Sequence, residues 1–171
     1  MSQISVVIGL IADTHGLWRP EIAGIFATVD LIVHAGDVGG HEILRHLNAI
    51  APTEAVSGNV DDRFDPALPR ERSLPVGNLT LHVSHGDELG HPTAERLLTR
   101  YAADILVYGH THKAQVVRDD NGRLVVNPGA AGPRRFNLEP SVALLTVSGR
   151  TADVRIITLS APSHANAAKN L

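Results

Sequence analysis

Five short polar segments of this chain carry side chains of the kinds that bind metal ions. All are carboxylates, an amide or imidazoles, and none is a thiol, because the chain has no cysteine. Seven such groups suffice for two cations about 3.5–4 Å apart if one carboxylate bridges them. This mixed ligand chemistry suits Mn²⁺, Fe²⁺, Co²⁺, Ni²⁺ or Zn²⁺ better than Ca²⁺, and Mn²⁺ is the metal we expect. The candidate ligands are Asp13, His15, Asp37, Asn59, His85, His110 and His112.

Each candidate ligand also has an ordinary structural explanation. Asp13 can cap a following helix. Asp37 and Asn59 each follow a glycine, as is common in turns. His85 can simply satisfy a backbone carbonyl. His110 and the nearby His112 share one short loop and are the hardest to explain structurally. The joint occurrence of these groups after successive predicted strands favours the metal interpretation.

The elements that must position these side chains alternate along the first two thirds of the chain. Buried strands are predicted at 4–12, 30–34, 53–56, 79–84 and 105–108, and helices at 20–29, 41–50 and 92–102. This alternation indicates a parallel sheet with right-handed crossovers, whose ligands gather at the carboxyl ends of the strands. Segment 61–75 is charged, holds three prolines and is predicted to be irregular.

Beyond the fifth strand the pattern changes to short strands joined by tight turns. Strands are predicted at 114–118 and 123–126, flanking an Asp-Asp-Asn-Gly turn, and at 142–147 and 152–159. Residues 160–171 are predicted to be a loose tail. The length of 171 residues fits one domain over 1–171.

Composition narrows the classes of partner. The net charge of −3, the pI near 6.3 and the 4% aromatic content make nucleic acid an unlikely partner. No apolar stretch approaches the roughly 20 residues that span a bilayer, so no membrane partner is expected. The first residues lack the basic start of a signal peptide, which predicts a cytoplasmic protein. Ten histidines are the unusual feature, because histidine is the commonest metal ligand.

The polar segments together resemble the five signature blocks of the calcineurin-like metallophosphoesterases. A further match, Asn127-Pro128-Gly129, resembles a block of the compact branch of small prokaryotic phosphodiesterases. The resemblance covers almost the whole chain and implies an α/β fold, a two-sheet β-sandwich flanked by helices. It also implies that Asp37 bridges two metals. One metal would take Asp13, His15 and His112, and the other Asn59, His85 and His110.

The activity expected from such a site is hydrolysis of a small phosphate ester, with a metal-bridging hydroxide as nucleophile. Many relatives place a histidine directly after the signature asparagine as a candidate general acid, but this chain has Val60 there. His34 can substitute as the acid or be a purely structural residue. Arg63 and Arg19 can bind substrate phosphate or be solvated surface residues.

Two other functions remain open. The resembled family includes a protein-trafficking subunit that uses the same fold as a binding scaffold, although such scaffolds lose ligands and this chain keeps all seven. A metal-dependent nuclease is the second alternative, against which the acidic charge balance argues. The sequence does not indicate an oligomeric state.

Overall fold

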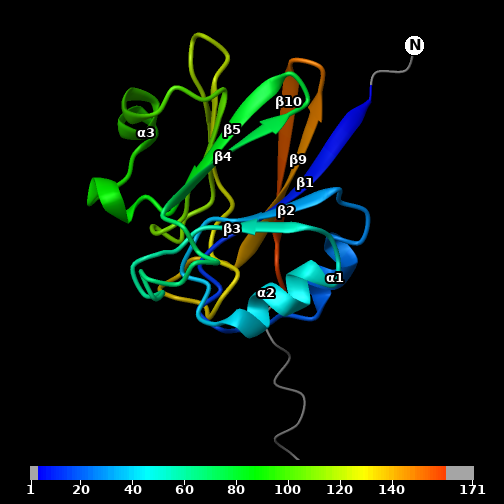
Figure 1. Ribbon diagram of the computed structural model, residues 1–171, viewed down its shortest axis with the longest axis vertical. Helices are drawn as coiled ribbons and strands as arrows, with labels where there is room; N and C mark the ends of the chain where they lie inside the picture. Colours follow the sequence, from blue (N-terminus) through cyan, green and yellow to red (C-terminus); the bar gives the residue numbers. More distant parts are fainter. Residues whose placement is uncertain (1–3, 161–171) are drawn as a thin grey trace, which may run out of the picture.

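The computed structural model describes residues 4–160, which form two five-stranded sheets packed face to face (Figure 1). The first sheet has the order β10-β9-β1-β2-β3. In it β1, β2 and β3 run parallel, whereas β9 is antiparallel to both β1 and β10. Its strands are β1 (Ser5–Ile11), β2 (Leu31–His34), β3 (Thr53–Ala55), β9 (Ser141–Ser148) and β10 (Thr151–Thr158).

The second sheet has the order β4-β5-β6-β8-β7. The inner strands β5, β6 and β8 are parallel, and each edge strand is antiparallel to its neighbour. The expected α/β sandwich of two sheets is therefore confirmed, while the single parallel sheet suggested by the strand-helix alternation is wrong. The strands are β4 (Glu71–Val76), β5 (Leu79–Ser84), β6 (Ile105–Val107), β7 (Gln115–Arg118) and β8 (Leu124–Asn127).

The helices are few and short. The first is much shorter than the predicted 20–29, because Gly24, Thr28 and Val29 are weak helix formers. The third begins where the Thr93 hydroxyl accepts a hydrogen bond from the Arg96 N–H at 3.2 Å. The helices are α1 (Glu21–Ile25), α2 (His41–Asn48), α3 (Ala94–Arg100) and the 3₁₀ helix η1 (Asp87–Leu89).

One predicted loop is partly a strand. Segment 61–75 was expected to be irregular, but its last part forms β4, which pairs with β5. Pro75 is tolerated because β4 is an edge strand, where a missing N–H can face away from the sheet. Three prolines in one segment favoured a loop, and only the tertiary pairing reveals the strand. Residues 161–171 of the predicted tail lie outside the described residues.

Apolar side chains fill the space between the sheets and the space beneath the helices. The largest cluster of buried residues joins β1, β2, β5, β6, β8 and β9. A second cluster lies between the first sheet and helices α1 and α2, where the Phe26 ring packs directly on Gly9. A Cβ on Gly9 would lie 2.9 Å from that ring, so the strand needs glycine there.

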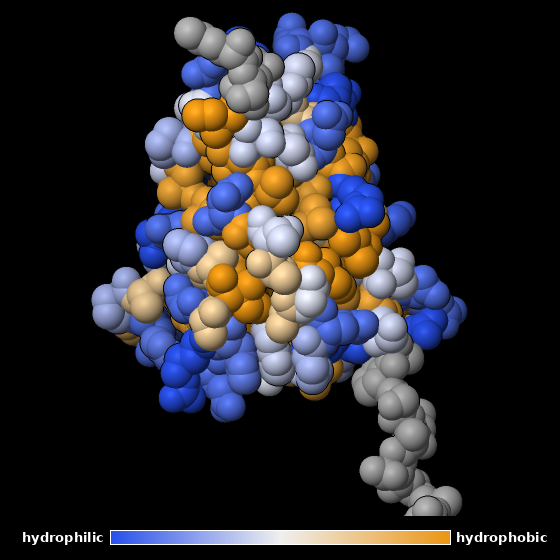
Figure 2. All heavy atoms as spheres, turned by 90° about the vertical axis from the view of Figure 1, so that its right-hand side faces the viewer, coloured by the Kyte–Doolittle hydropathy of each residue, from blue (hydrophilic) through white to orange (hydrophobic). Residues whose placement is uncertain are grey.

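The side of the molecule at the right of Figure 1 is turned to the viewer in Figure 2. Apolar side chains gather along its centre and hydrophilic ones surround them. The partly buried Val6, Val154 and Ile156 pack against the cluster between the sheets. Within residues 4–160, no helix is long and apolar enough to cross a membrane.

Candidate metal centre

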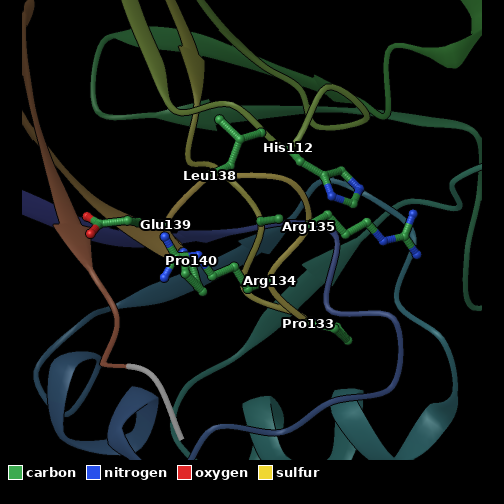
Figure 3. Close-up of a pocket in the computed structure, with 8 residues that line it drawn as sticks. His112, Pro133, Arg134, Arg135, Leu138, Glu139 and Pro140 are labelled. Atoms are coloured by element: carbon green, nitrogen blue, oxygen red, sulfur yellow. The ribbon is translucent and has the colours of Figure 1, made fainter.

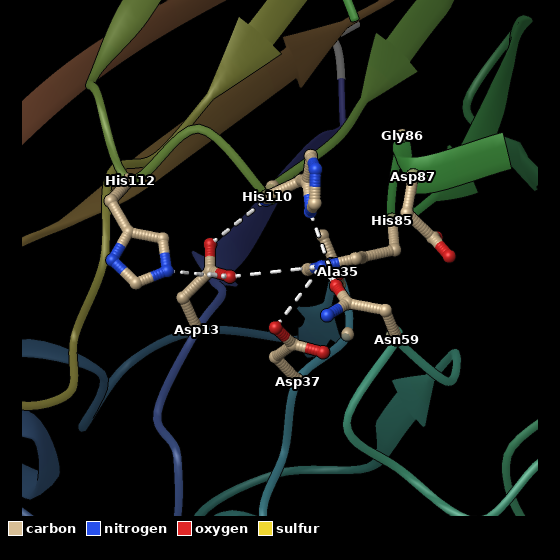
Figure 4. Close-up of polar contacts among 12 residues, drawn as sticks. Asp13, Ala35, Asp37, Asn59, His85, Gly86, Asp87, His110 and His112 are labelled. Atoms are coloured by element: carbon tan, nitrogen blue, oxygen red, sulfur yellow. Dashed lines mark hydrogen bonds and ion pairs between the residues drawn. The ribbon is translucent and has the colours of Figure 1, made fainter. Parts of the chain in front are cut away.

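The seven candidate ligands converge at one end of the sandwich, on the loops that follow β1, β2, β3, β5 and β6. Figure 4 labels all of them except His15. Two groups of possible ligand atoms each lie within 4.8 Å of one another. The two groups share Asp13. Asn59 links His110 to the second group, because its Oδ1 lies 3.1 Å from His85 Nε2 and 3.1 Å from His110 Nδ1. The two groups are Asp13, His15 and His112, and Asp13, Asp37 and His85.

The surroundings of the Asp13 carboxylate show whether a cation fits among these side chains. The residue is fully buried, and its Oδ2 accepts the His110 N–H at 3.1 Å. Its Oδ1 has no hydrogen-bond donor among the described residues. That oxygen lies 3.3 Å from His112 Nε2, 3.8 Å from His85 Nε2 and 4.0 Å from His15 Nε2. A buried carboxylate oxygen among imidazole nitrogens is costly without a partner, and a divalent cation satisfies it.

Asp37 lies between the two groups of histidines. Its Oδ2 is 3.6 Å from His15 Nε2 and 3.3 Å from His85 Nε2, while its Oδ1 accepts the Val60 N–H at 3.1 Å. This is the position expected of a bridging ligand, although Asp13 Oδ1 also lies near histidines of both groups.

Asp37 and His85 shift each other's pKa in opposite directions. Burial opposes ionisation of Asp37, but the hydrogen bond and charge of His85 together with the Val60 N–H outweigh it and lower the Asp37 pKa to about 2. Burial likewise opposes charging of His85, yet the bond to Asp37 and the charge of Asp13 raise its pKa to about 9. Without metal, His85 therefore carries a proton where a cation would otherwise balance the two carboxylates.

His85 is oriented by a backbone contact. Its Nδ1–H donates to the Ala35 carbonyl at 2.7 Å, which directs Nε2 toward Asn59 and Asp37. Metal-binding histidines commonly use their second nitrogen in this way, to fix the ring and the tautomer.

The backbone at this end of the sandwich is strained. A positive φ is rare outside glycine, yet among the described residues six non-glycine residues have one. Five of the six are candidate ligands, with φ between 46° and 68°. Such strain gathers at functional sites, where the required side chain outweighs its cost. The five are Asp13, His15, Asp37, His110 and His112.

Two polar side chains hold the ligand loops together. The Asp61 carboxylate accepts the N–H groups of Val38 and Gly39, after β2, and of Gly58, after β3, at 2.8–3.0 Å. On the second sheet, the buried Asn127 amide donates to the Gly109 carbonyl and to the Thr111 hydroxyl, each at 3.0 Å. Asn127 belongs to the Asn-Pro-Gly block found in the sequence, which therefore supports the loop of His110 and His112.

His34 lies beneath the ligand loops. It is fully buried, its Nε2 lies 2.9 Å from the Thr14 hydroxyl, and its Nδ1 accepts the Gly36 N–H at 3.2 Å. Burial lowers its pKa to about 4. A neutral ring with both nitrogens engaged favours the structural role for His34 over that of a general acid.

The two arginines considered for phosphate binding differ. Arg63 is exposed, and its contact with a substrate stays a prediction. Arg19 is only 5% exposed and donates to the carbonyls of Ala131, Gly132 and Ser160 at 2.9–3.0 Å. Both interpretations of Arg19, as a phosphate ligand and as a solvated surface residue, are therefore wrong. A buried guanidinium whose three nitrogens each donate to a backbone carbonyl has a structural role.

Another arginine beside the candidate ligands was missed by the sequence interpretation. Arg135 and His112 line the same small pocket, and Figure 3 shows the Arg135 side chain extending past His112. Burial lowers the pKa of His15, and the nearby charge of Arg135 lowers it further. The only signal in the sequence was a pair of arginines shortly after the Asn-Pro-Gly block.

Comparison with known proteins identifies the family. Residues 6–150 match the model of the calcineurin-like phosphoesterase superfamily domain. The chain belongs to this superfamily. It is 34% identical over 167 residues to a probable metallophosphoesterase of Methanothermobacter thermautotrophicus, covering 92% of this chain and 95% of that protein. A probable metallophosphoesterase of Bacillus subtilis, YsnB, is 34% identical over 158 residues, covering 85% of this chain and 87% of YsnB.

Solved structures share the fold of this superfamily member. Vacuolar protein sorting 29 of Cryptosporidium parvum superposes with a TM-score of 0.75 at 24% identity, covering 92% of this chain and 99% of that one. A predicted phosphoesterase of Streptococcus pneumoniae gives a TM-score of 0.69 at 20% identity, covering 92% and 91% of the two chains.

Proposed function

We propose that this chain is a dinuclear metal-dependent phosphoesterase that acts on small phosphodiesters. The observation that carries the proposal is the buried Asp13 Oδ1, which faces three imidazole nitrogens and has no donor among the described residues. Membership of the calcineurin-like phosphoesterase superfamily supports the reaction class.

The ligand atoms suit two divalent cations. We expect Mn²⁺ as the native metal, and this set of oxygen and nitrogen donors also suits Fe, Ni, Co or Zn. Such a pair, when bound, supplies Lewis-acid polarisation of the phosphoryl oxygens and water acidic enough to give hydroxide near neutral pH. In this assignment Asp37 would be a ligand shared by both cations. One would be held by Asp13, His15 and His112, and the other by Asn59, His85 and His110.

The protein's own part is to hold the ligands ready in the ionised or neutral form that binding needs. The low pKa of Asp37 keeps it a carboxylate at every physiological pH. The bond from His85 Nδ1 to the Ala35 carbonyl leaves Nε2 as the ligand atom once its proton is lost. Because left-handed backbone fixes Asp13 and Asp37, their carboxylates need little reorganisation to bind.

The leaving group receives little help from the protein. Val60 stands where many relatives have a candidate acid, and it is 55% exposed at the edge of the site. His34 is buried with both ring nitrogens engaged. We therefore expect esters with acidic leaving groups, such as nitrophenolate, to react much faster than alkyl esters.

The test is hydrolysis of bis(p-nitrophenyl) phosphate by protein stripped with EDTA and then reloaded with Mn²⁺, together with metal analysis of the purified protein. The reloaded protein should bind two ions and turn over the diester, and the stripped protein should not. Equal rates in both forms would contradict a metal-dependent reaction. We expect this small-molecule activity in the cytoplasm.

A second candidate is a protein-binding scaffold, favoured by the fold shared with vacuolar protein sorting 29. A structure of that protein from Entamoeba histolytica is described as a complex with Zn²⁺, so metal occupancy by itself does not separate scaffold from enzyme. Turnover does. A stoichiometric partner, combined with two bound ions and no hydrolysis of any ester, would favour the scaffold.

A further inference from the structure

The loop between β8 and β9 is fastened to the metal centre at its base. The N–H of Ala131 donates to the Ala12 carbonyl at 2.9 Å, and that of Gly132 to the Asp13 carbonyl at 3.0 Å. A Cβ on Gly132 would lie 2.4 Å from the Asp13 carbonyl oxygen, so the contact requires glycine. The Arg19 guanidinium holds the carbonyls of the same two loop residues. This loop is therefore positioned firmly against the strand that carries Asp13.

Beyond that base, the loop directs one of its two arginines toward the candidate ligands. Figure 3 shows Arg135 extending on the His112 side, while Arg134 turns toward Glu139 and Pro140. Arg135 is exposed and lines the same small pocket as His112. An exposed guanidinium beside a candidate ligand is well placed to pair with an anion bound there, because its fork matches two phosphate oxygens.

Phe136 follows Arg135 directly and has an unusual conformation. Its ring is 89% exposed, and its φ is 55°. A single exposed aromatic residue is ordinary, but a bulky residue with positive φ is not. It is the only non-glycine residue of this kind within residues 4–160 that is not a candidate ligand. The turn is closed by the Leu138 N–H, which donates to the Arg135 carbonyl at 3.2 Å. The strained residue holds an apolar side chain in solvent directly after Arg135, which needs an explanation other than packing.

We propose that Arg135 and Phe136 form a substrate-binding tip that selects phosphate esters carrying an aromatic ring. Arg135 pairs with a non-bridging phosphate oxygen, and Phe136 stacks on the flat ring of the same ligand. The inference rests on the proposed phosphoesterase function and names its substrate class. An aryl group and a nucleobase both offer such a ring.

The experiment measures binding to the full-length Mn²⁺-loaded protein by calorimetry, with methyl phosphate, phenyl phosphate and adenosine 5′-monophosphate as probes. The wild type should bind phenyl phosphate about 5- to 10-fold more tightly than methyl phosphate. Phe136→Asn removes the ring and keeps a residue that tolerates positive φ, so it should abolish this preference. Arg135→Gln should weaken all three ligands about 10- to 100-fold. Arg134→Gln is the matched control and should bind like the wild type.

The third probe separates the two sources of the ring. Adenosine monophosphate binding as tightly as phenyl phosphate, with loss in Phe136→Asn, assigns the site to nucleotides. A preference for phenyl phosphate alone assigns it to aryl esters. An unchanged phenyl preference in Phe136→Asn, or unchanged binding in Arg135→Gln, overturns the inference.

Turnover of bis(p-nitrophenyl) phosphate by the same proteins keeps the two proposals apart. Ring-selective binding without turnover in the wild type would refute the phosphoesterase function and leave the binding tip standing. Turnover unaffected by either variant, with unaffected binding, would refute the tip and leave the function standing. Phe136→Tyr, which keeps the ring, should restore wild-type selectivity in both measurements.

Discussion

The two ends of the sandwich both contain glycines in left-handed backbone, but the ligand end also places aspartate and histidine residues in that conformation. At one end, the hairpin turns between β4 and β5, β7 and β8, and β9 and β10 place glycine there: Gly77, Gly122 and Gly149. At the opposite end, five candidate ligands take the same conformation with an aspartate or a histidine. Glycine adopts positive φ without steric cost, whereas residues with a Cβ do not.

The contrast shows what each end of the sandwich requires of its residues. The hairpin turns need only a reversal of the chain, and glycine supplies it without strain. The ligand loops need the side chain as well as the reversal, so the fold tolerates the strain. Changes at the ligand end should therefore affect chemistry first, and changes at the hairpin end should affect stability alone.

The largest effect is expected for Asp37→Ala. Loss of the carboxylate between the two groups of histidines should lower both metal occupancy and diester turnover, the latter by more than about 1,000-fold, because a bound cation contributes several kcal/mol to such reactions. Metal analysis and steady-state kinetics measure the two quantities. Two tightly held ions in this variant would show that Asp37 does not bridge.

The next largest effect concerns acidification and His34. Its pKa is about 4 in the folded protein and about 6.5 when unfolded, so the native state binds fewer protons between these values. Stability should therefore fall as the pH drops from 6.5 toward 4, by up to about 3 kcal/mol. Urea unfolding of EDTA-treated protein measures the change. The matched variant His34→Gln, although less stable, should show a shallower dependence on pH. Parallel curves for the two proteins would contradict this role.

A smaller effect should follow from supplying the absent acid. Val60→His places an imidazole directly after Asn59, so it should speed the hydrolysis of esters with poor leaving groups about tenfold relative to nitrophenyl esters. The ratio of kcat/KM for an alkyl and an aryl ester measures this, and Val60→Gln is the control for polarity. An equal gain with both esters would indicate an effect other than protonation.

The smallest effect belongs to the hairpin end. Gly122→Ala should destabilise the protein by about 1 kcal/mol, because φ is 81° and no atom lies within 4 Å of the added Cβ, so the cost is conformational. Thermal unfolding measures it. Activity per folded molecule should equal that of the wild type. A loss of activity would show that the hairpin end affects catalysis as well as stability.

The same contrast explains which features could be predicted from the sequence. The candidate metal ligands were recognisable because each follows a buried strand in a short polar motif, and the structure brings all seven together. β4 was missed, and the two-sheet division came from the family resemblance rather than from the strand-helix alternation, because strand pairing depends on partners far along the chain. Local pattern gives no such information.

The arginines were misjudged for a related reason. Arg19 looks like any surface arginine in the sequence, and only the folded chain presents three carbonyl groups to it. Arg135 follows no recognised motif, and it matters because the loop after β8 folds back against Asp13. Residues whose role comes from contacts distant in sequence leave no local signal.

The hydrogen bonds of the Asp61 carboxylate allow opening of the ligand loops to be measured without any substrate. Because it accepts the amides of Val38, Gly39 and Gly58 together, the loops after β2 and β3 share one fastening. Any fluctuation that releases this carboxylate exposes all three amide hydrogens at once. Their deuterium uptake should then proceed at a common rate. That rate would measure how often the loops after β2 and β3 open.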